Sequence, residues 1–279
     1  LIQAEKKAVA EIKVVDEPVT VVVSEKGWVR ARQGHGHDAA GFAFKSGDAL
    51  YGTFECRTVD ALLVFGSNGR VYSVAVADLP GARGDGQPIT TLIELEAGSE
   101  VAHYFAGPQQ ALLLLSGSGG HGFVATVGDM LSRNRGGKAF IGVGEGEHIC
   151  GPSLVALDFE QKMPLAQMGQ APAAIDAIAA THVACVSTGG RILTFAIDEL
   201  KRMEKGGKGL MLMGLEAGDA LAGAAAYTRS VRISGVGRGG KPREEQLEIR
   251  SLNNALAARA RKGKPANFGF KPHAVARVQ

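Results

Sequence analysis

"ALLVFGSNGRVYSVAVADL", residues 61–79, is the stretch that decides the fold. An apolar run at 62–65 leads into Ser67-Asn68-Gly69, and a second apolar run follows over 70–76. Asn-Gly between two such runs is the strongest short hairpin signal, because both central residues of the turn need positive φ. The stretch therefore predicts a β-hairpin.

The hairpin recurs along the chain. Gly27, Gly69, Gly120 and Gly190 stand in the same turn of four copies, at spacings of 42, 51 and 70 residues. A hairpin repeated about every 40–50 residues is typical of bladed β folds. The long third spacing holds an insertion rich in Ala, Gln and Pro at 157–181, which we expect to protrude. The sequence predicts an all-β domain over 17–279, preceded at 1–16 by a linker from a helical domain.

Most copies continue into an acidic, apolar corner and then into a loop rich in glycine and basic residues. The corners are Asp78-Leu79, Asp129-Met130-Leu131 and Asp198-Glu199-Leu200. The loops read GARGDGQP (81–88), RNRGGKAF (133–140), EKGGKGLM (204–211) and, in the last copy, AARARKGKPAN (257–267). Because equivalent loops of successive repeats occupy equivalent places, we expect their charges to line one rim.

A basic rim of this kind suits duplex DNA, because cations neutralise phosphates and glycines let backbone amides approach closely, without base readout. The cations predicted to bind DNA are Arg30, Arg32, Lys45, Arg70, Arg83, Arg133, Arg135, Lys138, Arg191, Lys205, Lys208, Arg259, Arg261, Lys262 and Lys264. The alternative is that glycine and lysine only make good solvent turns. That alternative is the better one for any single loop, but recurrence in four copies favours DNA.

The charge distribution agrees with a polyanionic partner. The net charge is only +3, yet from Arg229 to the end twelve Lys and Arg stand against three Glu. A basic final quarter on an acidic body indicates one surface adapted to a polyanion. The alternative is a tail whose Lys and Arg only keep it soluble.

Several other classes find no support in the sequence. No apolar run approaches the ~18 residues of a membrane span, and no GxxxxGK[ST] phosphate loop occurs. Cys56, Cys150 and Cys185 are too far apart for a CxxC pair, so we expect reduced, buried thiols in a cytoplasmic protein. We find no convergent catalytic set, and we predict no catalytic, cofactor-binding or metal-binding residue in this chain.

The stretch GHGHD at 34–38 is the one candidate metal site. His35 and His37 point to the same side of a strand, but no cysteine or third histidine is close enough in sequence to complete a tetrahedron. We therefore expect no metal there.

Three stretches carry a family resemblance: SEKGWVRARQGHGHDAAGFAFKSGD (24–48), SNGRVYSVAVADLPGARGDGQP (67–88) and HGFVATVGDMLSRNRGGKAFI (121–141). They resemble the C-terminal domains of bacterial type IIA topoisomerase A subunits, with topoisomerase IV closer than gyrase. The resemblance covers about residues 17–278. It implies a β-pinwheel of about five four-stranded blades, in a closed or broken ring, whose basic rim binds and bends duplex DNA.

The resemblance also assigns functions to other parts of the enzyme. It implies that the catalytic tyrosine lies outside this chain, that ATP and Mg are used on other domains, and that no cofactor binds here. Partners would be double-stranded DNA, the ATPase-bearing B subunit, and the remainder of the A subunit, in the bacterial cytoplasm at the nucleoid. The isolated domain would be a monomer. Tyr51, Tyr72, Tyr104 and Tyr227 are expected to pack rather than to attack DNA.

Two alternatives remain open. Gyrase A subunits carry a Q-R-R-G-G-K-G box in the first blade, and residues 29–48 hold no such contiguous box, which favours topoisomerase IV over a divergent gyrase. A bladed domain that binds a protein instead of DNA is the other alternative.

Overall fold

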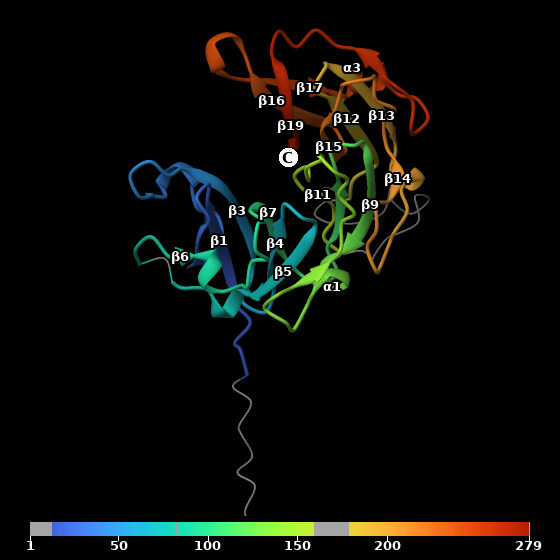
Figure 1. The fold of residues 1–279 in the computed structure, drawn as a ribbon. Helices are drawn as coiled ribbons and strands as arrows, with labels where there is room; N and C mark the ends of the chain where they lie inside the picture. The colour runs from blue at the N-terminus through green and yellow to red at the C-terminus, as the bar shows by residue number, and fades with distance from the viewer. Residues whose placement is uncertain (1–12, 82, 159–178, 279) are drawn as a thin grey trace, which may run out of the picture.

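The computed structural model describes residues 13–81, 83–158 and 179–278 (Figure 1). These residues form β-strands joined by loops and short helical turns, which confirms the all-β prediction. Most of the expected linker at 1–16 and of the expected insertion at 157–181 lies outside the described residues, so both stay predictions.

The strands form five antiparallel sheets, and each sheet is one blade (Figure 1). The first two strands of every blade form a hairpin. The hairpins are β1 (Pro18–Ser24) with β2 (Trp28–Gln33), β4 (Ala61–Gly66) with β5 (Arg70–Ala75), β8 (Leu112–Ser116) with β9 (His121–Thr126), β12 (His182–Ser187) with β13 (Arg191–Ala196), and β16 (Ser230–Val236) with β17 (Pro242–Glu248).

A third strand pairs with the first strand of each hairpin. These third strands are β3 (Leu50–Arg57), β7 (Val101–Gly107), β11 (Ser153–Ala156), β15 (Leu221–Tyr227) and β19 (Lys271–Val278). Short helical turns follow the second strands of the later hairpins, at η2 (Val76–Asp78), α1 (Val127–Met130), η5 (Ile197–Glu199) and α3 (Ile249–Asn253). The first three of these turns are the acidic corners expected from the sequence.

The fourth strand of each blade comes from the next repeat. It pairs with the second strand of the preceding hairpin, at β6 (Gln87–Pro88), β10 (Lys138–Ala139), β14 (Leu210–Met211) and β18 (Lys264–Pro265). β6, for example, follows the hairpin of the second blade in the chain but completes the sheet of the first. The fifth sheet has three strands within the described residues, and none of them pairs with the outer edge of β17.

Glycines stand at two places in each repeat, in the hairpin turn and before the fourth strand. The four expected hairpin glycines have φ between 85 and 92, which confirms that they share one turn. The expected positive φ at Asn68 is wrong, because the Gly69 N–H donates to the Gly66 carbonyl at 3.0 Å and the left-handed residue of the turn is the glycine alone. A second glycine precedes each fourth strand. Gly137 has φ 61, and a Cβ there would lie 2.4 Å from the carbonyl oxygen of Val71 in β5. Equivalent close contacts are found at Gly86, Gly209 and Gly263.

The core lies between successive blades. In β4, Leu62 and Val64 pack into the cluster shared by the first and second blades, whereas Leu63 and Phe65 pack into the cluster shared by the second and third. Burial on both faces explains the uninterrupted apolar run of this strand. Two more clusters join the third blade to the fourth and the fourth to the fifth. In the part of the chain that the structure describes, no cluster combines the first and fifth blades, so the packing runs from neighbour to neighbour.

We expect Gly137→Ala to lower the free energy of unfolding by about 1–3 kcal/mol, because the new Cβ meets the Val71 carbonyl and the backbone stays at positive φ. Urea denaturation measures the change. Gly136→Ala is the matched control, since a Cβ there first meets an Asn134 side-chain atom at 3.4 Å. Equal losses in both variants would contradict the close-contact explanation.

Candidate nucleic-acid interface

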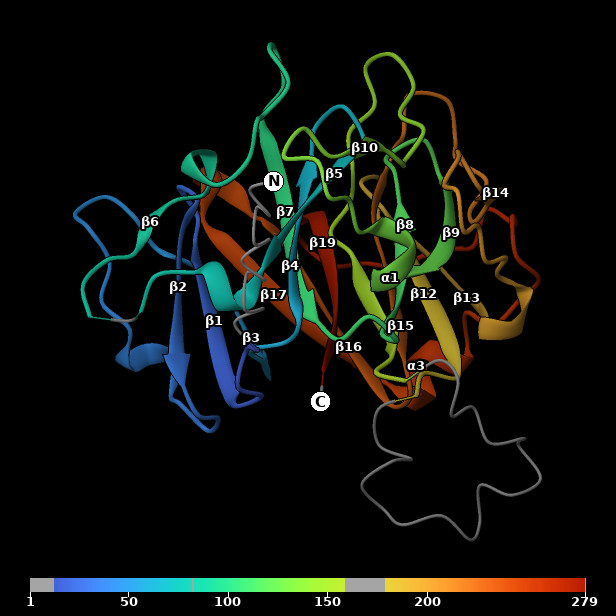
Figure 2. The same ribbon diagram turned by 90° about the horizontal axis from the view of Figure 1, so that it is seen from below.

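Four rim loops run from the helical corners to the fourth strands, over residues 79–86, 131–137, 200–209 and 254–263. Each ends on the outer edge of a blade, where its fourth strand pairs. In Figure 2, β6 and β14 lie at the periphery, while the third strands β7, β15 and β19 lie in the middle. The expectation that the basic loops occupy equivalent positions along one rim is confirmed by this pairing.

Three of the predicted arginines hold the rim loops in place. Arg70 donates to the carbonyl of Gly136 from Nε at 3.0 Å and from Nη2 at 2.9 Å, and Nη2 also lies 3.0 Å from the carbonyl of Gly137. Arg191 donates in the same way to the carbonyls of Lys262 and Gly263, at 3.0 and 2.7 Å. In both cases the arginine directly follows the hairpin glycine.

Arg30 plays the corresponding part in the first blade. Its guanidinium donates to the carbonyls of Gly84 and Ala43, both at 2.6 Å, and lies over the rings of Phe42 and Phe44. Only 6% of Arg30 is exposed. The sequence placed Arg30 among the DNA-binding cations, but the structure buries its charge beneath a loop, where it is not presented to a phosphate.

A second group of cations is exposed and makes no side-chain hydrogen bond or ion pair within the described residues. Each is carried by a rim loop or by the strand that follows it. They are Arg83, Arg133, Lys205, Lys208, Arg261 and Lys264. Their charges are available to an external anion. Lys201, exposed in the third rim loop, belongs with them and was missed, although its position between the corner and the glycines could have indicated it.

The remaining rim cations have partners in the protein. Arg135 donates to the Thr91 carbonyl at 2.8 Å, and Lys138 to the Asp129 carbonyl at 2.6 Å. Arg259 donates to the Met211 carbonyl at 2.7 Å, while Lys262 lies 3.2 Å from the Glu216 carboxylate. These contacts orient the four side chains along the rim. Carbonyl acceptors leave the positive charge in place, whereas Glu216 offsets that of Lys262.

In the first blade the expected cations lie against aromatic rings. Lys45 Nζ is 3.8 Å from the centroid of the Trp28 ring, and the Arg32 guanidinium is 5.8 Å from that of Phe42. Both cations are exposed. This part of the surface adjoins the first rim loop, since Arg30 binds a carbonyl from each.

The GHGHD stretch forms a loop after β2, so the expectation that His35 and His37 lie on a strand is wrong. His35 Nε2 hydrogen-bonds the Cys56 carbonyl at 2.8 Å, and His37 Nε2 the Gln33 carbonyl at 2.7 Å. Asp38 caps a helical turn at η1 (Ala39–Gly41). Across the residues that the structure describes, no group of three or more His, Cys, Asp or Glu side chains is arranged to hold a metal ion.

Asp129 and Arg202 form an ion pair, a contact that the sequence did not predict. Arg202 reaches the carboxylate through Nη2 at 3.0 Å and Nε at 3.1 Å, and Thr126 closes a capping box with Asp129. Burial alone would raise the pKa of Asp129, but hydrogen bonds from Arg202 and Thr126 hold it below its usual value. The pair ties the third rim loop to the corner of α1.

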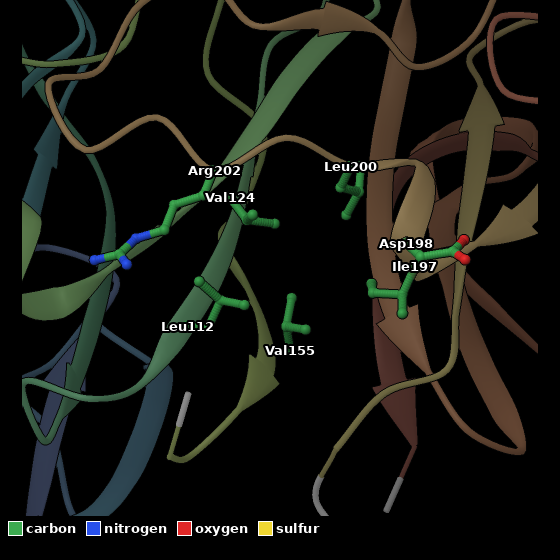
Figure 3. A pocket seen from close by; sticks show the side chains of 7 residues that line it. All are labelled: Leu112, Val124, Val155, Ile197, Asp198, Leu200 and Arg202. Atoms are coloured by element: carbon green, nitrogen blue, oxygen red, sulfur yellow. The ribbon is translucent and has the colours of Figure 1, made fainter. Parts of the chain in front are cut away.

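A cavity of about 230 Å³ lies between the third and fourth blades. Leu112, Val124, Val155, Ile197 and Leu200 line it, and the charged groups of Asp198 and Arg202 point away from it in opposite directions (Figure 3). Tyr72, Tyr104 and Tyr227 are buried, as a packing role predicts, and the partly exposed Tyr51 packs edge-on against Tyr104 and hydrogen-bonds His103 Nδ1 at 3.0 Å. The three cysteines are free and buried, as expected. Among the described helices, none is long and apolar enough to cross a membrane.

Comparison with known proteins is consistent with this geometry. A family model described as the DNA gyrase C-terminal domain, a β-propeller, matches residues 60–103 and 181–227, which are the second and fourth repeats. The A subunit of DNA topoisomerase 4 from Neisseria gonorrhoeae is 36% identical over 269 residues, 95% of this chain and 32% of the relative. The A subunit of DNA topoisomerase 4 from Pseudomonas aeruginosa is 30% identical over 275 residues, which are 96% of this chain and 33% of the relative.

The solved E. coli ParC C-terminal domain superposes with a TM-score of 0.71 at 29% identity, covering 93% of this chain and 98% of that one. The chain belongs to the family of C-terminal domains of topoisomerase IV and gyrase A subunits. A solved gyrase A C-terminal domain, at 16% identity and a TM-score of 0.62, shares the fold. As a member of this family, the chain spans about a third of the length of the curated relatives that it matches.

We expect acid to destabilise the protein partly through Asp129. Because its folded pKa is lowered, its contribution is present above the unfolded value near 3.8 and is lost as the pH falls through the folded value. Asp129→Asn should therefore lower stability at pH 7 and flatten the loss below about pH 4, as measured by thermal melts across pH. Asp198→Asn, at the next corner, is the control, and an unchanged acid profile in Asp129→Asn would contradict this assignment.

Proposed function

We propose that this chain is the DNA-holding domain of a bacterial topoisomerase IV A subunit, and that it binds duplex DNA along the rim loops without regard to sequence. The observation that carries the proposal is the row of exposed cations on successive rim loops that have no partner among the described residues. The family to which the chain belongs supports a role on DNA.

The contact is electrostatic. Each cation that neutralises a phosphate releases condensed counterions, so affinity falls with salt while sequence has little effect. The glycines of the rim loops allow backbone N–H groups to approach phosphates as well. DNA that follows the outer edges of several blades has to bend, which costs on the order of 1–6 kcal/mol for a short duplex and is offset by the additional phosphate contacts.

The domain orients DNA for chemistry done elsewhere in the enzyme. In this proposal the other domains of the A subunit cleave and rejoin the strands, and the B subunit hydrolyses ATP with Mg, for decatenation and relaxation in chromosome segregation. The chain alone is a monomer without cleavage activity, in the bacterial cytoplasm at the nucleoid. The first-blade loop carries GHGHD in the region where gyrase A subunits have the Q-R-R-G-G-K-G box. This difference supports holding of DNA rather than full wrapping.

The rim loops can be tested by neutralising Arg133, Lys208 and Arg261 to alanine together. If each contacts one phosphate, the slope of log affinity against log salt concentration should become less steep by about 2–3, because each contact contributes about 0.9. Gel-shift titrations of a duplex of about 40 base pairs at several salt concentrations measure the slope.

The matched control neutralises Arg229, Arg238 and Lys271, which are exposed in the fifth blade but lie outside the rim loops. This control has the same net charge as the rim variant, and its slope should stay close to that of the unmodified protein. Equal losses in the two variants, or no loss in the rim variant, would contradict binding along the rim loops.

A further inference from the structure

Arg30 stands at a position that the next three repeats fill with an apolar or aromatic side chain. The position is the third after the hairpin glycine, and it holds Tyr72, Phe123 and Leu193 in those repeats. Each of the three packs into the cluster that its blade shares with the preceding blade. Within the described residues no sheet precedes the first blade, and on this face Arg30 contacts two loops instead.

The guanidinium of Arg30 is buried, and the salt bridges of the described residues do not include it. A charge taken out of water is costly unless its donors are satisfied. Here one terminal nitrogen bonds the Ala43 carbonyl in the first-blade loop (residues 34–48), and the other bonds the Gly84 carbonyl in the first rim loop. The rings of Phe42 and Phe44 supply favourable cation–π contacts. Arg30 therefore ties two loops together.

Two exposed cations of the first blade depend on the rings that Arg30 contacts. Lys45 directly follows Phe44 in the chain, so its backbone is fixed with that ring. The guanidinium of Arg32 lies over the same Phe42 ring as that of Arg30, at 5.8 and 5.7 Å from the centroid. Both Lys45 and Arg32 are exposed, whereas Arg30 is not.

A third exposed cation lies at the other carbonyl that Arg30 binds. Arg83 directly precedes Gly84 in the first rim loop, and its side chain is exposed. This loop leads to β6, which pairs with β2, the strand that carries Arg30. The two strands lie side by side at the periphery of the molecule (Figure 2). The contacts of Arg30 thus reach three exposed cations on two loops and one strand.

We propose that Arg30 is a positioning residue for DNA binding, which holds Arg32, Lys45 and Arg83 as one group of phosphate-binding cations and does not touch DNA itself. This inference rests on the proposed function, because it concerns how one end of the basic surface is built. The fork geometry of arginine is required, since a lysine ammonium has neither two separate nitrogens for the two carbonyls nor a planar face for the two rings.

Arg30→Lys tests the proposal because it keeps the charge and removes the fork. We expect the slope of log affinity against log salt concentration to become less steep by about 2–3, since each phosphate contact contributes about 0.9. The combined variant Arg32→Ala, Lys45→Ala and Arg83→Ala should show the same change. Gel-shift titrations of a duplex of about 40 base pairs measure both slopes.

Trp28 reports on the first-blade loop without DNA. It is the only tryptophan of the chain, and Lys45 Nζ lies 3.8 Å from its ring centroid. Acrylamide quenching of its fluorescence should increase in Arg30→Lys, because the loop is released from the ring. If circular dichroism shows that Arg30→Lys is unfolded, Phe42→Leu with Phe44→Leu takes its place, since this variant loosens the same loop at unchanged charge. Its salt slope should become less steep by about 1–2.

A direct contact between Arg30 and DNA is distinguished by adding Arg30→Met to the combined alanine variant. The proposal expects no further change in slope, and a further loss of about 0.9 would overturn it. An unchanged slope in Arg30→Lys would also overturn it. If the rim variant of Arg133, Lys208 and Arg261 still loses slope in that case, the proposed function stands and only this inference fails. If neither variant loses slope, both fail.

Discussion

The outer edge of the second strand is covered in four of the five described sheets, since aligned backbone groups without partners are costly. In the first four blades the cover is two residues of the next repeat, seated so closely that glycine must precede them. This one pairing interlocks consecutive blades, because each repeat completes the sheet before it. Because each fourth strand lies on the outer edge of a blade, the chain that leads to it runs over the outside of the molecule and forms a rim loop.

The cations of the rim loops and hairpins fall into two groups, one that holds the loop backbone and one that is exposed to solvent. Arginines that follow the hairpin turns, such as Arg70 and Arg191, bind loop carbonyls and fix the backbone. With the carbonyls turned toward these guanidiniums, neighbouring side chains such as Arg133 and Arg261 stay in solvent. A guanidinium suits the first task because its planar fork reaches several acceptors at once.

Much of the fold could be predicted from local signals. The Asn-Gly turn at 68–69 and its three counterparts indicated the hairpins, since positive φ at those glycines is a property of the turn itself. The exchange of fourth strands could not be read from the chain, because a two-residue strand such as β10 has no pattern of its own. Charge alone also could not separate Arg30, which is buried against carbonyls, from Arg133, which is exposed; that difference depends on which loop folds over each side chain.

The basic rim follows from one rule of assembly, by which the next repeat supplies the fourth strand of each of the first four blades. Hydrogen–deuterium exchange with and without duplex DNA tests the central claim most directly. The account predicts protection by DNA in the rim loops at 79–86, 131–137, 200–209 and 254–263, with little change in β7, β15 and β19. Protection concentrated in those third strands, with the rim loops unchanged, would contradict it.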